Sequence, residues 1–331
     1  MERFALAAAV VLGFALTAAL CSLFVPLRRV LERREQNQQP AQSEQPRPAP
    51  LRAPLWGGLC AAAGTVAAVG VGWLAACVGQ PELLGSEGRL MTRLLTALAG
   101  SLAFGAVGLA EDLARMRSPA ALGLRRDVRL LLEALAAAFV LLLLQAAGCL
   151  PRGLDVPGAG YVLLGSAVPF LWAVLMVALA ECARIAERDE GTVCGAAFVA
   201  MLALMMAEAG LGVPGLAVLP AALAGALVAL GLWAFPPARL GVGCCGSLLA
   251  AGAIGCIPLS LDMTSLTVPL ALPFWAAGGL LAAQLLGAKR TGKPLRCWVK
   301  KHKMSPETVF LCSFALSAVG YMLALALLRW C

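Results

Sequence analysis

The sequence carries little charge for its length and almost no histidine. Charged residues make up only 13% of its 331 residues, and His302 is the single histidine. Soluble globular proteins carry about twice that share of charge, so an ordinary water-soluble fold is excluded. One histidine also excludes a histidine-rich metal site.

Cysteine spacing gives no metal or disulfide signature. The 12 cysteines are mostly single residues within apolar runs, and no CxxC or mixed Cys/His array has the spacing of a zinc site. Cysteine in such runs packs as a small hydrophobic residue. The sequence also lacks an internal repeat, which argues against transporter folds built from inverted repeats.

Long apolar runs are what the sequence has in abundance. Hydrophobic residues form 61% of the chain, and several runs reach the roughly 20 residues that a helix needs to cross a bilayer. Unalternating runs of Ala, Leu and Val satisfy their backbone as helices and not as barrel strands, so the sequence predicts an all-α polytopic membrane protein. The first run, 6–25, is too long for a cleavable signal peptide and is predicted to be the first span.

Clusters of Pro, Gly or charged residues divide the chain into ten predicted spans within one transmembrane domain, 1–331. The spans are placed at 4–26, 54–77, 92–110, 128–147, 160–180, 193–209, 214–234, 246–261, 267–287 and 308–329. Two hydrophilic segments are predicted to be cytoplasmic loops: a Gln/Pro-rich loop at 27–53 and a basic loop at 288–307.

The distribution of positive charge gives an independent test of this topology. Most of the 26 basic residues fall in loops that follow odd-numbered spans, and the other side holds only Arg3, Arg89, Arg93, Arg152 and Arg329. Because Lys and Arg accumulate on the cytoplasmic side, both termini are predicted to be extracytoplasmic. The positive excess is explained by topology and contact with anionic lipid, and it requires no nucleic-acid partner.

Acidic residues gather on the same predicted cytoplasmic side. Glu111 and Asp112 end the third span, directly after an apolar run, and acids at membrane depth are costly unless they are paired or hydrated. They are therefore a candidate site, where carboxylates would hold Mg²⁺ and basic groups would bind phosphate. The alternative is a solvated helix end at which these acids pair with Arg115 or Arg117. The stretch ERDEG, 187–191, is similarly typical of an exposed charged loop.

Six short stretches follow one another in an order that matches a known family. They are APLWGG (53–58), GLAED (108–112), GLR with Arg129 and Glu133 (123–133), ECARIAERDEG (181–191), PARLGVGCCGSL (237–248) and KHK (301–303). In this order they resemble the motifs of the polyprenyl-phosphate N-acetylhexosamine-1-phosphate transferases. Within that family they are most similar to the bacterial phospho-N-acetylmuramoyl-pentapeptide transferases (MraY type).

The resemblance implies a role for each matching residue. Glu111 and Asp112 stand at the catalytic acidic pair, and Asp112 and Glu187 at metal-binding carboxylates for Mg²⁺. Arg129 and the cluster Lys301, His302 and Lys303 stand at substrate-binding positions. The resemblance further implies polyprenyl phosphate and a UDP-linked amino sugar as substrates, membrane lipid as the surroundings, a homodimer, and a multi-pass location in the bacterial plasma membrane.

The chain departs from the family pattern at several of these positions. Glu111 replaces an aspartate, Glu181 and Arg184 replace two asparagines, and Cys244 replaces the aspartate of the GDxGS motif. Mg²⁺ prefers hard oxygen ligands, whereas a thiol is soft and largely protonated near neutral pH. Cys244 is therefore a poor Mg²⁺ ligand, and its presence is expected to impair a phosphoryl transfer that depends on positioning and charge neutralisation.

Three hypotheses follow. The chain is either a phosphoglycosyl transferase of altered chemistry that uses Mg²⁺, or a catalytically inactive paralogue that needs no cofactor and keeps the scaffold for lipid or partner binding. The chemistry at Cys244 favours the inactive paralogue. An unrelated transporter is the least favoured hypothesis, because it leaves the order of the motifs unexplained.

Overall fold

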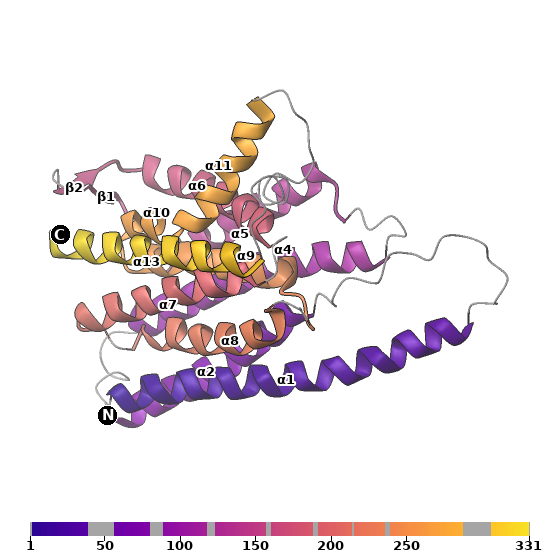
Figure 1. Ribbon diagram of the computed structural model, residues 1–331. Helices are drawn as coiled ribbons and strands as arrows, with labels where there is room; N and C mark the ends of the chain where they lie inside the picture. Colours follow the sequence, from indigo (N-terminus) through magenta and orange to yellow (C-terminus); the bar gives the residue numbers. More distant parts are fainter. Residues whose placement is uncertain are drawn as a thin grey trace.

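The protein is a bundle of α-helices with one small β-hairpin (Figure 1). The computed structural model describes residues 2–38, 56–79, 89–117, 123–156, 160–187, 191–213, 215–235, 239–286 and 306–330. Its helices are α1 (Glu2–Gln38), α2 (Gly57–Gly79), α4 (Arg89–Arg117), α5 (Arg126–Ala146), α6 (Ala167–Ala186), α7 (Thr192–Gly210), α8 (Val218–Ala234), α9 (Gly243–Ser260), η1 (Thr264–Leu266), α10 (Thr267–Leu270), α11 (Leu272–Leu286) and α13 (Pro306–Trp330).

Seven of the described helices are long and apolar enough to cross a membrane: α1, α2, α4, α6, α7, α9 and α13. Helix α8 is apolar but shorter, with 17 residues. The two remaining predicted spans fall on α5 and on the pair α10 and α11. The helical, polytopic membrane class is thus confirmed, whereas the count of ten spans stays a prediction.

Both ends of the chain lie at one end of the bundle. Figure 1 shows the start of α1, the end of α13 and the β-hairpin on the same side. This arrangement agrees with termini that share one side of the membrane. Which side faces the cytoplasm remains the prediction made from the positive charges.

The hairpin corrects the expected start of the fifth span. Strands β1 (Gly153–Val156) and β2 (Gly160–Leu163) pair antiparallel, with Gly153 opposite Leu163, so the span predicted from residue 160 begins only with α6 at Ala167. Gly160 and Gly165 have φ angles of +71° and +59°. Glycine adopts this backbone readily, so the two glycines turn the chain where an apolar run had suggested continuous helix.

Two further boundaries differ from the predicted ones. Helix α1 continues to Gln38, so the first part of the predicted 27–53 loop is helical, and 39–55 lies outside the described residues. The span predicted at 267–287 is broken into α10 and α11, which meet at Ala271. Pro269 and Pro273 lie on either side of this break, and proline cannot continue a regular helix through its own position.

Helix α9 is the centre of the bundle, and each of its 18 residues is buried. It packs most extensively against α4, and the two backbones touch. A Cβ added to Gly108 would lie 2.2 Å from the carbonyl oxygen of Cys244, and one added to Gly58 of α2 would lie 2.1 Å from the amide nitrogen of Gly246. Small residues permit such close helix contacts in membranes. The contact at Gly108 also places the acidic pair of α4 beside the start of α9.

Candidate functional site

Glu111 and Asp112 lie inside α4 and not at its end, because the helix continues to Arg117. Their exposed fractions are only 2% and 1%. The expectation of a solvated helix end is therefore wrong on exposure. Its pairing was correct, since the Glu111 carboxylate lies 2.6 Å from the Arg115 guanidinium. A glutamate and an arginine four residues apart share one face of a helix.

Asp112 joins α4 to the start of α9. One of its carboxylate oxygens accepts a hydrogen bond from the backbone N–H of Cys244 at 3.1 Å, and the other accepts from Cys245 at 2.9 Å. These amides belong to the first turn of α9, where backbone N–H groups have no helical partner and the helix dipole favours negative charge. Gly243, with a φ of +72°, brings the chain into this turn. The carboxylate of Asp112 thus caps a helix from a distant part of the sequence.

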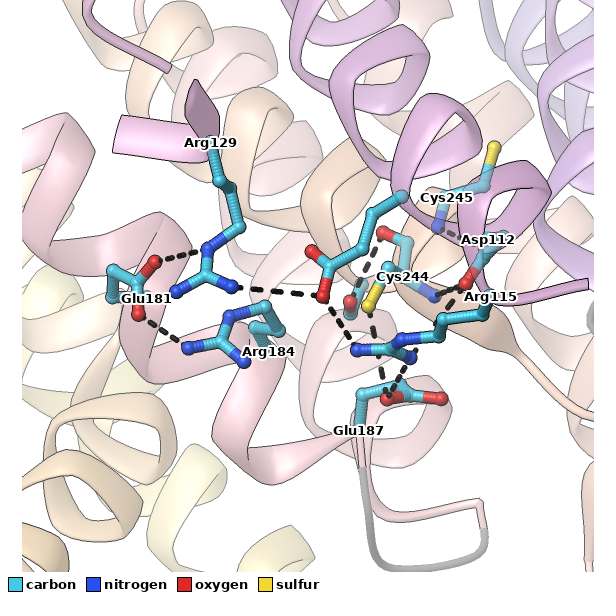
Figure 2. A network of polar contacts seen from close by, with 10 residues as sticks. Asp112, Arg115, Arg129, Glu181, Arg184, Glu187, Cys244 and Cys245 are labelled. Carbon is cyan, nitrogen blue, oxygen red and sulfur yellow. Dashed lines mark hydrogen bonds and ion pairs between the residues drawn. The ribbon is translucent and has the colours of Figure 1, made fainter. Parts of the chain in front are cut away.

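Arg115 stands among three carboxylates. Its guanidinium lies 2.6 Å from Glu111 and 3.8 Å from both Asp112 and Glu187. Figure 2 shows its guanidinium lying above Glu187, on the same side of the network as Asp112 and Cys244. Ion pairs that are this shielded from water gain more from their geometry than exposed ones do.

A second set of ion pairs continues the network through α5 and α6. Nε of Arg129 donates to Glu181 at 2.7 Å, Arg184 donates to the other oxygen of Glu181 at 2.5 Å, and Arg129 also lies 3.7 Å from Glu111. Arg129, predicted to bind substrate, is 7% exposed and is paired with the protein's own carboxylates. The two residues that replace the family's asparagines, Glu181 and Arg184, neutralise each other.

Sequence reasoning did not assign a site role to Glu181 and Arg184. The signal that could have found them is their spacing, because opposite charges three residues apart on a helix face each other. Glu133, one turn after Arg129 on α5, is fully buried. In the described part of the chain, neither of its carboxylate oxygens has a hydrogen-bond partner. Buried polar groups of this kind are commonly satisfied by ordered water.

Cys244 lies in the first turn of α9, beside Glu187. It is fully buried, and its Sγ lies 3.9 Å from a carboxylate oxygen of Glu187. The hydroxyl of Ser247 donates to the Cys244 carbonyl at 3.1 Å. Cys244 and Cys245 are both free thiols, and Figure 2 shows their sulfur atoms pointing in different directions. The adjacent cysteines therefore belong to the helix start and are not joined by a disulfide.

The residues present do not fit the Mg²⁺ that the family resemblance implies. Among the described residues, no group of three or more His, Cys, Asp or Glu side chains is arranged to hold a metal ion. Both Asp112 oxygens accept backbone amides, and Glu111 and Glu187 lie against Arg115. The remaining position holds the thiol of Cys244, and Mg²⁺ demands a near-octahedral shell of oxygen ligands.

The structure therefore unites only part of the predicted site. It brings Glu111, Asp112, Glu187, Cys244 and Arg129 into one network. Lys301, His302 and Lys303 lie outside the described residues, as does most of the predicted basic loop at 288–307. Residues 306–307 of that loop already belong to α13.

Comparison with known proteins covers the region that contains this network. A family model described as glycosyl transferase family 4 matches residues 94–262, from α4 to just beyond α9. The phospho-N-acetylmuramoyl-pentapeptide-transferase of Mycobacterium tuberculosis is 27% identical over 265 residues, which cover 72% of each chain. The enzymes of the same name from a Synechococcus species and from Desulforudis audaxviator are 30% and 31% identical over 212 and 170 residues, 63% and 48% of this chain and 55% and 50% of theirs.

Proposed function

Because the chain belongs to glycosyl transferase family 4, we propose that it is a catalytically inactive member of the phospho-N-acetylmuramoyl-pentapeptide-transferase type. In this proposal it resides in the bacterial plasma membrane and binds the ligands of that reaction, a polyprenyl phosphate carrier or a UDP-linked amino sugar. It keeps the family's scaffold for lipid or partner binding but does not transfer the sugar phosphate.

The commitment of Asp112 to α9 carries this proposal. Both of its oxygens accept backbone amides, at 3.1 and 2.9 Å, so its charge stabilises the fold at the position where the family has a catalytic acid. Cys244 supplies a thiol in place of a further aspartate. Phosphoryl transfer depends on charge neutralisation and alignment around the phosphate. A site whose acids face amides and arginines lacks the negative charge to hold a divalent ion for that purpose.

The second candidate is an active transferase, which would pass a sugar phosphate from a UDP-sugar to polyprenyl phosphate and release UMP. One observation favours it. Carboxylates still stand at three of the family's acidic positions, as Glu111, Asp112 and Glu187, and they converge on one point of the bundle. Activity that depends on Mg²⁺ would require Arg115 to withdraw from these carboxylates when substrate binds.

UMP release separates the two candidates. The purified full chain in detergent would receive undecaprenyl phosphate, a UDP-linked N-acetylmuramoyl pentapeptide and Mg²⁺. We expect no release above that of an Asp112→Asn variant, whose folding is checked by thermal unfolding. Release above this control would overturn the proposal. Binding of undecaprenyl phosphate, measured by native mass spectrometry against a neutral polyprenol of equal length, tests the retained ligand. Equal binding of both lipids would exclude phosphate recognition.

A combined variant tests which departures from the family pattern make the site inactive. Cys244→Asp together with Glu181→Asn and Arg184→Asn restores the residue types of the family's pattern at these positions. Release of UMP by this variant, but not by Cys244→Asp alone, would show that the ion pair on α6 contributes to inactivity. If the combined variant unfolds cooperatively but releases no UMP, other residues of the network must also prevent activity.

A further inference from the structure

A positive charge already occupies the middle of the acidic site. The Arg115 guanidinium lies within ion-pair distance of Glu111, Asp112 and Glu187. The side chains of these acids are 3%, 1% and 11% exposed, and that of Arg115 is 20% exposed. Carboxylates so far removed from water need a counter-charge close by. Arg115 supplies it from the same helix that carries two of the three acids.

A guanidinium and a divalent ion cannot both serve these carboxylates. A magnesium ion sits about 2.0–2.1 Å from each oxygen ligand, and Arg115 already approaches Glu111 to 2.6 Å. An ion at that point would lie within a few ångströms of a guanidinium that stays protonated under all ordinary conditions. Like charges at such a separation repel strongly in a buried site. The two cations are therefore alternatives.

The charges of the ion pairs among the described residues lead to the same conclusion. Four carboxylates, those of Glu111, Asp112, Glu181 and Glu187, face three guanidinium groups, those of Arg115, Arg129 and Arg184. The fourth carboxylate charge is stabilised in part by the two amides of α9 that bind Asp112. The described ion pairs therefore leave an excess of one negative charge, which is less than the two charges that a divalent ion would bring.

We propose that Arg115 is the resident cation of this site and takes the place of a divalent metal ion. The inference deepens the proposed function, because it states how the same site is neutralised, and it rests on the family membership used there. It does not require the chain to be inactive, since a fixed guanidinium could equally stabilise a phosphate without a metal.

Binding of Mn²⁺, followed by the electron paramagnetic resonance signal of the free ion, tests this inference without measuring activity. The full chain in detergent is expected to show no saturable site. The variant Arg115→Met with Cys244→Asp removes the resident cation and restores a carboxylate, and it should gain at least about tenfold in affinity, which is 1.4 kcal/mol. Arg117→Met with Cys244→Asp is the matched control. It makes the same change of charge at the exposed end of α4 and should not gain a site.

Three results would overturn the inference. They are saturable Mn²⁺ binding by the wild-type chain that Asp112→Asn abolishes, equal binding by the test and control variants, and no gain in a test variant that unfolds cooperatively. If the test variant does not fold, the melting temperature of the wild-type chain tests the inference instead. Replacing EDTA with Mg²⁺ should leave this melting temperature unchanged. A rise in melting temperature with Mg²⁺ that the Asp112→Asn variant does not show would contradict the inference. If the chain releases UMP but binds no metal, the proposed inactivity is wrong and the assignment of Arg115 as the resident cation stands. If the chain binds Mn²⁺ but releases no UMP, the assignment of Arg115 is wrong and the proposed inactivity stands.

Discussion

Glu181 and Arg184 form an ion pair on the last turns of α6, with 2.5 Å between a carboxylate oxygen and a guanidinium nitrogen. They stand where the resembling family has two neutral asparagines, so the site has gained one charge of each sign. Either charge alone would be costly in this partly buried position, whereas the two together are tolerated. The departures from the family pattern are therefore linked in space and form a consistent set.

A double-mutant cycle measures that linkage. We expect Glu181→Gln and Arg184→Gln each to lower the melting temperature in detergent, because Glu181→Gln removes the carboxylate that Arg184 and Arg129 share, and Arg184→Gln leaves Glu181 with Arg129 alone. The double variant should lose less than the sum of the two, with a coupling energy of about 0.5–3 kcal/mol, the range for residues in one ion-pair network. Additive losses would show that the pair contributes no interaction energy.

Replacing Arg129 tests whether this residue stabilises the fold. It contacts Glu181 and Glu111 from α5 and is 7% exposed. Breaking a buried ion pair by removing one partner typically costs about 3–5 kcal/mol, so Arg129→Met should strongly reduce the thermal stability of the chain without ligand. Arg126→Met, on the exposed part of the same helix, is the control and should change little. Unaltered stability of Arg129→Met would show that its ion pairs do not stabilise the fold.

The contact between α4 and α9 should tolerate no side chain at Gly108. A Cβ there would lie 2.2 Å from the backbone oxygen of Cys244, which forces the helices apart and lengthens the hydrogen bonds that Asp112 accepts. Gly108→Ala is expected to cost about 1–3 kcal/mol, as overpacking of a tight core does. Gly70→Ala on α2, where a Cβ would meet no atom within 4 Å, should be neutral or slightly stabilising in the same thermal unfolding assay.

Thiol labelling checks the enclosure of Cys244. In the folded chain the fully buried Cys244 should not react with a water-soluble maleimide, and it should react only after denaturation. Thiol reactivity requires access as well as the thiolate form. A variant that keeps Cys244 as the single one of the 12 cysteines makes the labelling site unambiguous, and mass spectrometry quantifies the adduct. Rapid labelling of Cys244 in the folded protein would mean that the start of α9 opens to solvent.

The membrane class of the fold could be predicted because apolar runs report directly on spanning helices. The break between α10 and α11 and the hairpin before α6 were missed, since apolar residues such as Tyr161 and Val162 look alike in a strand and a helix. The burial of Glu111 and Asp112 was also missed. It depends on α4 continuing to Arg117 and on α9 packing beside it, and a pattern along the sequence does not report either feature.

The order of the motifs predicted which residues belong to the candidate site, but it did not predict which residues they contact. Glu111, Asp112, Glu187, Cys244 and Arg129 were singled out from their motif positions, and the structure joins them in one network, while their functional roles stay predictions. Their partners were the unpredictable part. Asp112 binds an amide 132 residues away, and Arg129 binds a carboxylate 52 residues away. Pairing at such separations is set by the packing of helices, and the spacing rules of a single helix do not reach it.

The cap that Asp112 places on α9 has a consequence for biosynthesis. When α4 enters the membrane, the amides that will satisfy Asp112 have not yet been made, because α9 follows only after four more helices. Until then Asp112 and Arg115 depend on each other or on water at the membrane surface. A nascent chain stalled before Gly243 would leave the Asp112 carboxylate without its two amide partners, and completion of α9 would supply them.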